Sequence, residues 1–130
     1  MIVVDASVLV TALSDDGPDG DRARGRLHGE RLAAPQLVDL EVISAWQRLA
    51  AVGDLDERRA LLALDDLRSL RMNRVDHAPL IERCWELRDT LTVHDGAYVA
   101  LAELFGVSLI TADARLARAP GPTCEIELLS

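Results

Sequence analysis

The sequence predicts an α/β fold with a mostly parallel sheet and right-handed crossover connections. Short apolar stretches of strand length alternate along the chain with longer segments of helical periodicity. With 130 residues, 49% of them hydrophobic, the chain is long enough for one domain with a real core. No internal repeat, low-complexity tract or linker interrupts it, so we expect residues 1–130 to form a single domain.

Five segments are expected as strands. Residues 2–4 are apolar and β-branched, which indicates a buried strand. Residues 32–34 form a brief strand that stops at Pro35, and residues 73–76 are a weaker candidate. Residues 107–110 are the second clearly buried strand. Residues 125–128 alternate between polar and apolar, as an edge strand does.

Helices are expected between these strands, with a loop at residues 14–20 where Ser, Asp, Gly and Pro gather. The expected helices cover residues 7–13, 21–28, 36–51, 54 or 56 to 70, 78–89, 92–105 and a short turn at 113–117. Gly53 and Gly106 end two of them, and Pro79 is tolerated in a first turn. Residues 37–46 are apolar on nearly all sides, which predicts a buried helix.

The charge balance argues against a general nucleic-acid binder, because the formal net charge is −8. It does not exclude a nuclease whose acids hold metal ions. Lysine is absent, so every basic residue is an arginine. An arginine can hold a phosphate with two parallel hydrogen bonds or form an ion pair within its own helix, and the sequence leaves both roles open.

The cysteines and the apolar runs point to the cytoplasm. Cys84 and Cys124 lack the spacing of a zinc site, so we interpret them as small hydrophobic residues in a reducing cytosol. No apolar run approaches the roughly 20 residues of a membrane span, and the N-terminus does not resemble a signal peptide. We therefore expect no membrane association.

Four carboxylates stand where composition alone would not place them. Asp5 and Asp113 follow the two buried strands, at the sheet edge where open α/β folds bind ligands. Glu41 lies inside the apolar helix, and Asp95 opens a helix of small and apolar residues. We prefer Glu41 to Asp39, because the helix dipole explains an acid near the N-terminus by itself.

Each acid also has a structural explanation. Asp5, Asp95 and Asp113 suit helix N-termini, and Glu41 could pair with Arg48 or another arginine. If the four acids converge, their repulsion raises some carboxyl pKa values unless a cation neutralises them. Mg²⁺ or Mn²⁺ suits such oxygen ligands, activates a water and stabilises a leaving oxygen. That chemistry is phosphodiester hydrolysis without a covalent intermediate.

The order of these segments resembles the PIN-domain ribonucleases, most of all the VapC toxins of bacterial toxin–antitoxin pairs. The segments that carry the resemblance span essentially the whole chain: Val3-Val4-Asp5-Ala6-Ser7, Glu41 in its apolar helix, His94-Asp95-Gly96-Ala97-Tyr98-Val99-Ala100-Leu101-Ala102, and Leu109-Ile110-Thr111-Ala112-Asp113-Ala114-Arg115-Leu116-Ala117.

The resemblance implies a three-layer sandwich with a central five-stranded sheet flanked by helices. It implies an Mg²⁺-dependent endoribonuclease, with Mn²⁺ as an alternative, that cleaves RNA and is neutralised by a cognate VapB-type antitoxin. It also implies a homodimer. It assigns metal binding and catalysis to four acids and an auxiliary role to two hydroxyl groups: Asp5, Glu41, Asp95 and Asp113, with Ser7 and Thr111.

Two features depart from the family pattern. His94 and Gly96 flank the third acid, where the family often has Tyr and Ala, and Arg115 stands where some members carry a further acid. His94 would either contact RNA or cap its helix.

Three other functions compete. A haloacid-dehalogenase-like phosphatase would need a second Asp at position 7, where Ser7 stands, and a lysine that the chain lacks. A histidine–aspartate phosphohydrolase would need more metal-ligand histidines than the His94-Asp95 pair. A PIN-like module that only binds a protein partner is the alternative from outside the enzymes.

Overall fold

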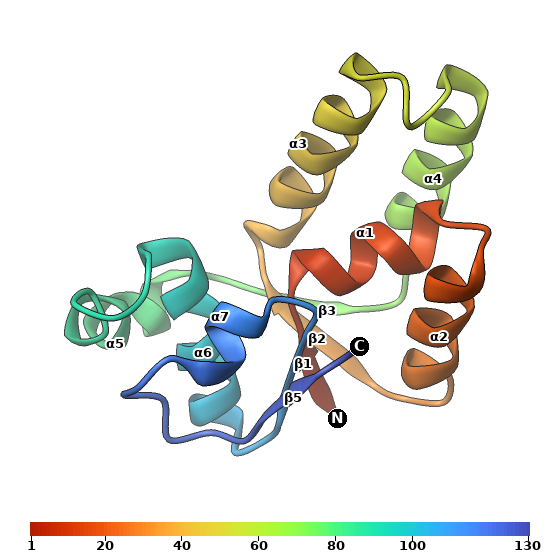
Figure 1. Ribbon diagram of the computed structural model, residues 1–130. Coiled ribbons are helices and arrows are strands. Elements are labelled where there is room, and N and C mark those ends of the chain that lie inside the picture. Colours follow the sequence, from red (N-terminus) through yellow and green to blue (C-terminus); the bar gives the residue numbers. More distant parts are fainter.

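Five strands form one entirely parallel sheet in the computed structural model, which describes residues 1–130 (Figure 1). The strands in chain order are β1 (Ile2–Val4), β2 (Leu32–Pro35), β3 (Asn73–Val75), β4 (Leu109–Thr111) and β5 (Ile126–Leu128). Their order across the sheet is β3-β2-β1-β4-β5. The predicted fold class and all five strands are confirmed, including the weak candidate β3 and the edge strand β5.

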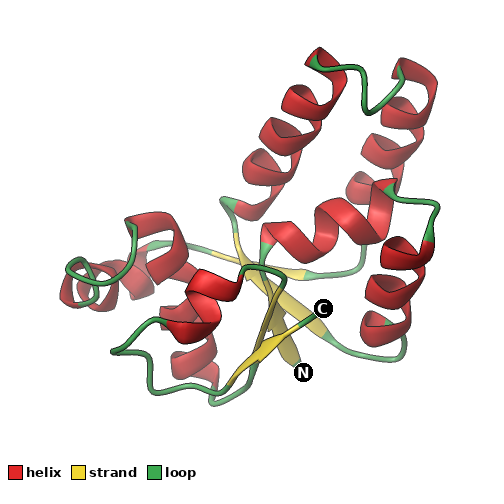
Figure 2. Cartoon of the chain, viewed as in Figure 1, coloured by secondary structure: helices red, strands yellow, loops and turns green.

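Helices cover both faces of the sheet. The strand order runs outward from β1 to β3 and then from β4 to β5 on the other side, so right-handed crossovers put the helices before β3 on one face and those after it on the other. Figure 2 shows the strands between these two groups of helices. The first group is α1 (Ala6–Ser14), α2 (Pro18–Leu27), α3 (Val38–Ala51) and α4 (Glu57–Ser69); the second is the 3₁₀ helix η1 (Ala78–Leu80), α5 (Ile81–Glu86), α6 (Val93–Phe105) and α7 (Ala114–Arg118).

The central strand β1 is completely enclosed. Val3 and Val4 have no exposed surface, and the small residues of α6 let that helix pack against β1, β2 and β4. The chain changes direction across the sheet between β1 and β4, which makes their carboxyl ends a topological switch point. Asp5 and Asp113 follow these two strands, so both acids lie at the edge where this fold class binds ligands.

The prediction that the helix around Glu41 is buried was wrong. Helices α3 and α4 form a hairpin that projects from the sheet (Figure 1). Only one stripe of α3 is buried, and Leu40 and Ile43 are 73% and 41% exposed. Leu61 and Leu62 of α4 are exposed as well. This hairpin therefore carries apolar side chains that the rest of the chain does not cover.

Two helix boundaries also differ from the prediction. Helix α2 begins at Pro18 rather than at Asp21, because proline suits the first helical position, where no amide donor is needed. The helix expected over residues 78–89 is the short 3₁₀ helix η1 followed by α5, which ends at Glu86. No helix has the length and apolar character that a bilayer crossing requires.

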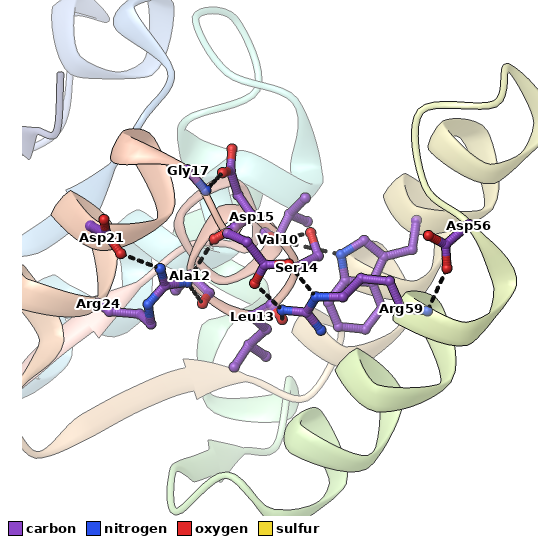
Figure 3. Close-up of polar contacts among 12 residues, drawn as sticks. Val10, Ala12, Leu13, Ser14, Asp15, Gly17, Asp21, Arg24, Asp56 and Arg59 are labelled. Atoms are coloured by element: carbon purple, nitrogen blue, oxygen red, sulfur yellow. Dashed lines mark hydrogen bonds and ion pairs between the residues drawn. The ribbon is translucent and has the colours of Figure 1, made fainter.

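Arginines from neighbouring helices hold the C-terminal end of α1 (Figure 3). Arg24 of α2 donates to the carbonyls of Ala12 and Asp15 at 2.9 and 2.7 Å, and Arg59 of α4 donates to the carbonyl of Leu13 at 2.9 Å. The last carbonyls of a helix have no partner within it, and cations there are favoured by the helix dipole. These contacts fix α1, whose first turn follows Asp5.

Candidate active site

Asp5 is the most buried carboxylate of the chain, with 6% of its surface exposed. Its two oxygens accept hydrogen bonds from the first turn of α1 and from the end of β4: Ser7 Oγ donates to Oδ1 and Thr111 Oγ1 donates to Oδ2, both at 2.5 Å. The amide of Val8 also donates to Oδ1, at 3.4 Å, so Asp5 caps α1. Asp5 therefore caps α1 and also lies at the edge where this fold class binds ligands.

The ionised form of Asp5 is poorly solvated. Burial raises the pKa of Asp5, and the charge of Asp95 raises it further, while the hydrogen bonds from Ser7, Thr111 and Val8 lower it; the net pKa is above the ordinary value. A positive charge at this edge would offset that cost, since an opposite charge favours the ionised carboxylate.

Two backbone amides orient the hydroxyl groups that hold Asp5. The amide of Ala112 donates to Ser7 Oγ, and the amide of Asp113 donates to Thr111 Oγ1, each at 3.0 Å. The hydroxyl hydrogens are thereby directed at Asp5. The ends of β1 and β4 thus form one hydrogen-bonded unit that includes the two residues expected as auxiliaries.

Glu41 is half-buried in α3 and meets α6 through a residue that sequence reasoning missed. Tyr98 Oη donates to Glu41 Oε1 at 2.5 Å. Burial raises the pKa of Tyr98, and its hydrogen bond to Glu41 adds to the rise, so the phenol remains a donor at neutral pH. The spacing of Asp95 and Tyr98 was the available signal, because residues three apart lie on the same side of a helix.

Asp95 lies in the first turn of α6 and lines the same groove as Glu41. This groove has a volume of about 510 Å³. Thr92 is the N-cap of α6, since its hydroxyl accepts the amide of Asp95 at 3.1 Å, which leaves the carboxylate of Asp95 free of a capping role. The structure therefore brings Asp5, Glu41 and Asp95 to one region of the carboxyl edge.

Asp113 is close to this region but is held by another residue. Its carboxylate accepts the amide of Arg115 at 2.9 Å and pairs with the Arg115 guanidinium at 3.3 Å. Burial alone would raise the pKa of Asp113, but the amide and guanidinium of Arg115 outweigh that effect and lower the pKa below its ordinary value. Only its backbone, through Thr111, connects Asp113 to Asp5.

The donor chemistry of the edge fits a hard divalent cation. Its available donors are carboxylate and hydroxyl oxygens, the ligands that Mg²⁺ and Mn²⁺ take. No three acidic, histidine or cysteine side chains stand close enough together to form a complete cation site as arranged here. Asp5, Glu41 and Asp95 supply charge at the edge, and Asp113 would have to turn away from Arg115 to join them.

Two residues next to the site, Asp39 and His94, have roles that the structure defines. Asp39 forms a bidentate ion pair with Arg74, with N–O distances of 2.7 and 3.0 Å, so it is a structural acid. The suggestion that His94 caps α6 was wrong, because Thr92 does so. His94 is exposed and lines the groove beside Asp95.

Comparisons with known proteins agree with this architecture. The PIN domain family model matches residues 2–122. Ribonuclease VapC1 of Mycobacterium tuberculosis is 44% identical over 128 residues, which cover 98% of this chain and 96% of that protein. The crystal structure of PAE2754 from Pyrobaculum aerophilum matches with a TM-score of 0.69 and 27% identity, over 98% of this chain and 83% of that one.

A fourth comparison supports the fold alone. VapBC2 from Rickettsia felis, in a crystal structure with a DNA fragment from its promoter, matches with a TM-score of 0.71 and 16% identity over 100% of both chains. The family-model match and the VapC1 identity each extend over nearly the whole length. The chain therefore belongs to the PIN-domain family and, within it, to the VapC proteins.

Proposed function

We propose that this protein is a metal-dependent endoribonuclease that acts in the cytoplasm as the toxin of a toxin–antitoxin pair. The relative that is 44% identical over nearly the whole chain is named a ribonuclease. The observation that carries the proposal is the buried Asp5, held by two hydroxyl groups at the switch point, with Glu41 and Asp95 beside it.

Four acids would hold Mg²⁺ or Mn²⁺ at this edge: Asp5, Glu41, Asp95 and Asp113. The bound cation supplies the positive charge and the activation of water that phosphodiester hydrolysis requires. Ser7 and Thr111 orient the carboxylate of Asp5 through their hydroxyl groups, and Tyr98 orients that of Glu41. Residues that fix a donor in this way reduce the reorganisation needed when charge develops in the reaction.

RNA cleavage with and without metal tests the enzyme proposal. We expect the purified protein to cleave RNA with Mg²⁺ or Mn²⁺, to stop when EDTA is added and to recover when metal is restored. Asp95→Asn should be inactive while remaining folded, because the Asp95 carboxylate forms no hydrogen bond or ion pair within the protein. Cleavage that survives EDTA would contradict the metal mechanism, and a well-folded protein that cleaves no RNA with either metal would favour the module that only binds a partner.

The proposed protein partner is a VapB-type antitoxin. The family resemblance implies this partner, and the Rickettsia felis structure that shares the fold is described as VapBC2. Co-expression with the antitoxin should yield a stable complex with reduced RNA cleavage, measured by size-exclusion chromatography and by the same assay. Full cleavage by the isolated complex would contradict neutralisation by direct binding.

The homodimer remains a proposal from the family resemblance. An apolar surface on α5 and α6, with Ile81, Trp85 and Val93 exposed around a cavity of about 430 Å³, is available for a second copy. Analytical ultracentrifugation should give twice the monomer mass, and a monomer at all concentrations would contradict the proposal.

A further inference from the structure

We propose that Arg48 binds a backbone phosphate of the RNA in the groove beside Glu41 and Asp95 and thereby sets the position of the strand. The inference rests on the proposed ribonuclease function and adds a substrate-binding residue to it. Arg48 does not contact the acids that would bind metal, so its role is in binding and not in the chemical step.

Most arginines of the chain already have an acidic partner. Eight form ion pairs with carboxylates: Arg22, Arg24, Arg26, Arg59, Arg68, Arg74, Arg83 and Arg115. The remaining six pair with no carboxylate: Arg31, Arg48, Arg58, Arg71, Arg88 and Arg118. Among these six, only Arg48 lines the groove that contains Glu41 and Asp95.

The local geometry keeps Arg48 available. It is exposed on α3, and its guanidinium donates to Ser44 Oγ at 3.0 Å, which draws the side chain along the groove wall. The expected alternative, an ion pair between Glu41 and Arg48, does not form: Glu41 accepts the hydroxyl of Tyr98, and Arg48 donates to Ser44. One helix thus presents a carboxylate and an unpaired guanidinium to the same groove.

The chemistry of this arrangement suits RNA. A protein of net charge −8 repels a polyanion, so an unpaired cation beside the acidic site has a large local effect. A guanidinium matches a phosphate with two parallel hydrogen bonds and is weakly hydrated. Arg48 lies two helical turns after Glu41, about 10 Å along the axis. Arg48 is therefore set apart from the acids along the groove, where it can meet a phosphate other than the one that is cleaved.

Direct binding measurements test the assignment without depending on cleavage. Fluorescence anisotropy of a labelled single-stranded oligoribonucleotide would be followed with Mn²⁺ in an Asp95→Asn background, which blocks turnover. Arg48→Gln should weaken binding about tenfold, as expected for a lost charge-assisted hydrogen bond. It should also reduce the slope of log K against log salt by roughly 0.7, the value for one phosphate contact on a single strand.

Two further variants distinguish a specific effect of Arg48 from the general effect of removing one positive charge from the protein. Arg31→Gln removes an exposed, unpaired arginine just before β2, at the opposite end of the strands, and should leave both the affinity and the salt slope unchanged. Arg48→Lys keeps a positive charge and should restore much of the salt slope, although a lysine binds phosphate as a point charge. In an otherwise wild-type chain, Arg48→Gln should raise KM for RNA with kcat nearly unchanged.

Several results would overturn the inference. Equal affinities for the Arg48→Gln and Arg31→Gln variants would remove Arg48 from the RNA site, and a fall in kcat at constant KM would give it a different role. Loss of binding to an oligoglutamate peptide with RNA binding intact would assign Arg48 to a protein partner. Failure of the ribonuclease proposal is distinguishable, because it appears as absent cleavage by the wild-type protein with either metal.

Discussion

The hydroxyl of Tyr98 donates a 2.5 Å hydrogen bond to Glu41 and so joins α6 to α3 at the site. Tyr98 is buried, whereas Glu41 is half-buried on a helix that projects into solvent. Helix α6, which packs against the sheet, therefore holds the side chain of Glu41, whose own helix α3 is only partly covered.

Replacing Tyr98 by Phe tests this relationship. The ring remains in the core, but Glu41 loses its donor, so we expect a loss of about 1 kcal/mol in the free energy of unfolding. We also expect weaker Mn²⁺ binding, because Glu41 is no longer held. Isothermal titration calorimetry and chemical denaturation measure the two effects.

Glu41→Gln is the matched control for that variant. The amide still accepts the Tyr98 hydroxyl, so stability should be preserved while Mn²⁺ binding is lost. Unchanged Mn²⁺ affinity in the Tyr98→Phe variant would remove the positioning role from Tyr98.

Asp5→Asn should stabilise the protein at neutral pH when metal is absent. Burial raises the pKa of Asp5 in the folded state, so the folded state binds more protons than the unfolded state between the two pKa values. Stability from this group is therefore greatest below the unfolded pKa and falls as pH rises through the folded pKa. Thermal unfolding in EDTA across this pH range should show the fall in the wild type and not in the variant.

Asp39→Asn provides the contrast, because it breaks the bidentate pair with Arg74 and should destabilise the protein. A lower midpoint for the Asp5→Asn variant at neutral pH would mean that its hydrogen bonds matter more than its desolvation.

Metal-dependent thermal unfolding tests the four acids as one set. A ligand that binds only the folded state adds roughly 2.7 kcal/mol of stability at a hundred times its dissociation constant. We expect Mg²⁺ or Mn²⁺ to stabilise the wild type, and each single amide substitution at Asp5, Glu41, Asp95 or Asp113 to weaken that response. A full response in the Asp113→Asn variant would show that Arg115 keeps this acid out of the metal site.

Arg115→Gln should strengthen metal binding. The guanidinium of Arg115 occupies the carboxylate of Asp113 and lowers its pKa. Since an exposed ion pair contributes at most about 1 kcal/mol, we expect a gain in Mn²⁺ affinity of about twofold to fivefold, measured by calorimetry. Arg118→Gln, an unpaired arginine on the same helix, should have no effect, and equal gains from both variants would point to general charge instead.

Arg59→Met should reduce stability without changing the groove. It removes the donor to the carbonyl of Leu13 at the end of α1, so we expect a loss of roughly 2 kcal/mol in chemical denaturation. Asp16→Asn removes only the exposed pair with Arg59 and should cost less than about 1 kcal/mol. Equal losses would mean that the ion pair, and not the carbonyl contact, holds α1.

The sequence predicted the parallel sheet well because its strands are buried and have simple patterns. Helix burial was harder to predict. The apolar composition of residues 37–46 is the same whether other elements cover all sides of the helix or only one side. Leu40 is exposed on a projecting hairpin, and only the tertiary arrangement decides which side of such a helix is covered.

The candidate site was predictable where strand ends position a side chain. Asp5 was predicted from its position at the end of β1, whereas Ser7 and Thr111 were expected only from the family resemblance. Both hydroxyl groups donate to Asp5 in the structure. Tyr98 and Arg48 were not assigned to the site, because their roles depend on how α3 meets α6. Which residue each acid contacts depends on distances between side chains, and the spacing of residues along the sequence does not determine these distances.

The central position of β1 has a consequence for synthesis on the ribosome. The first strand of the nascent chain can pair with β2 early, but its other neighbour, β4, leaves the ribosome only near the end of translation. Until then, one edge of β1 has no partner and Asp5 lacks the hydroxyl of Thr111, 106 positions away. A stalled or truncated chain therefore carries an open strand edge that aggregates or recruits chaperones, and it cannot assemble a finished site.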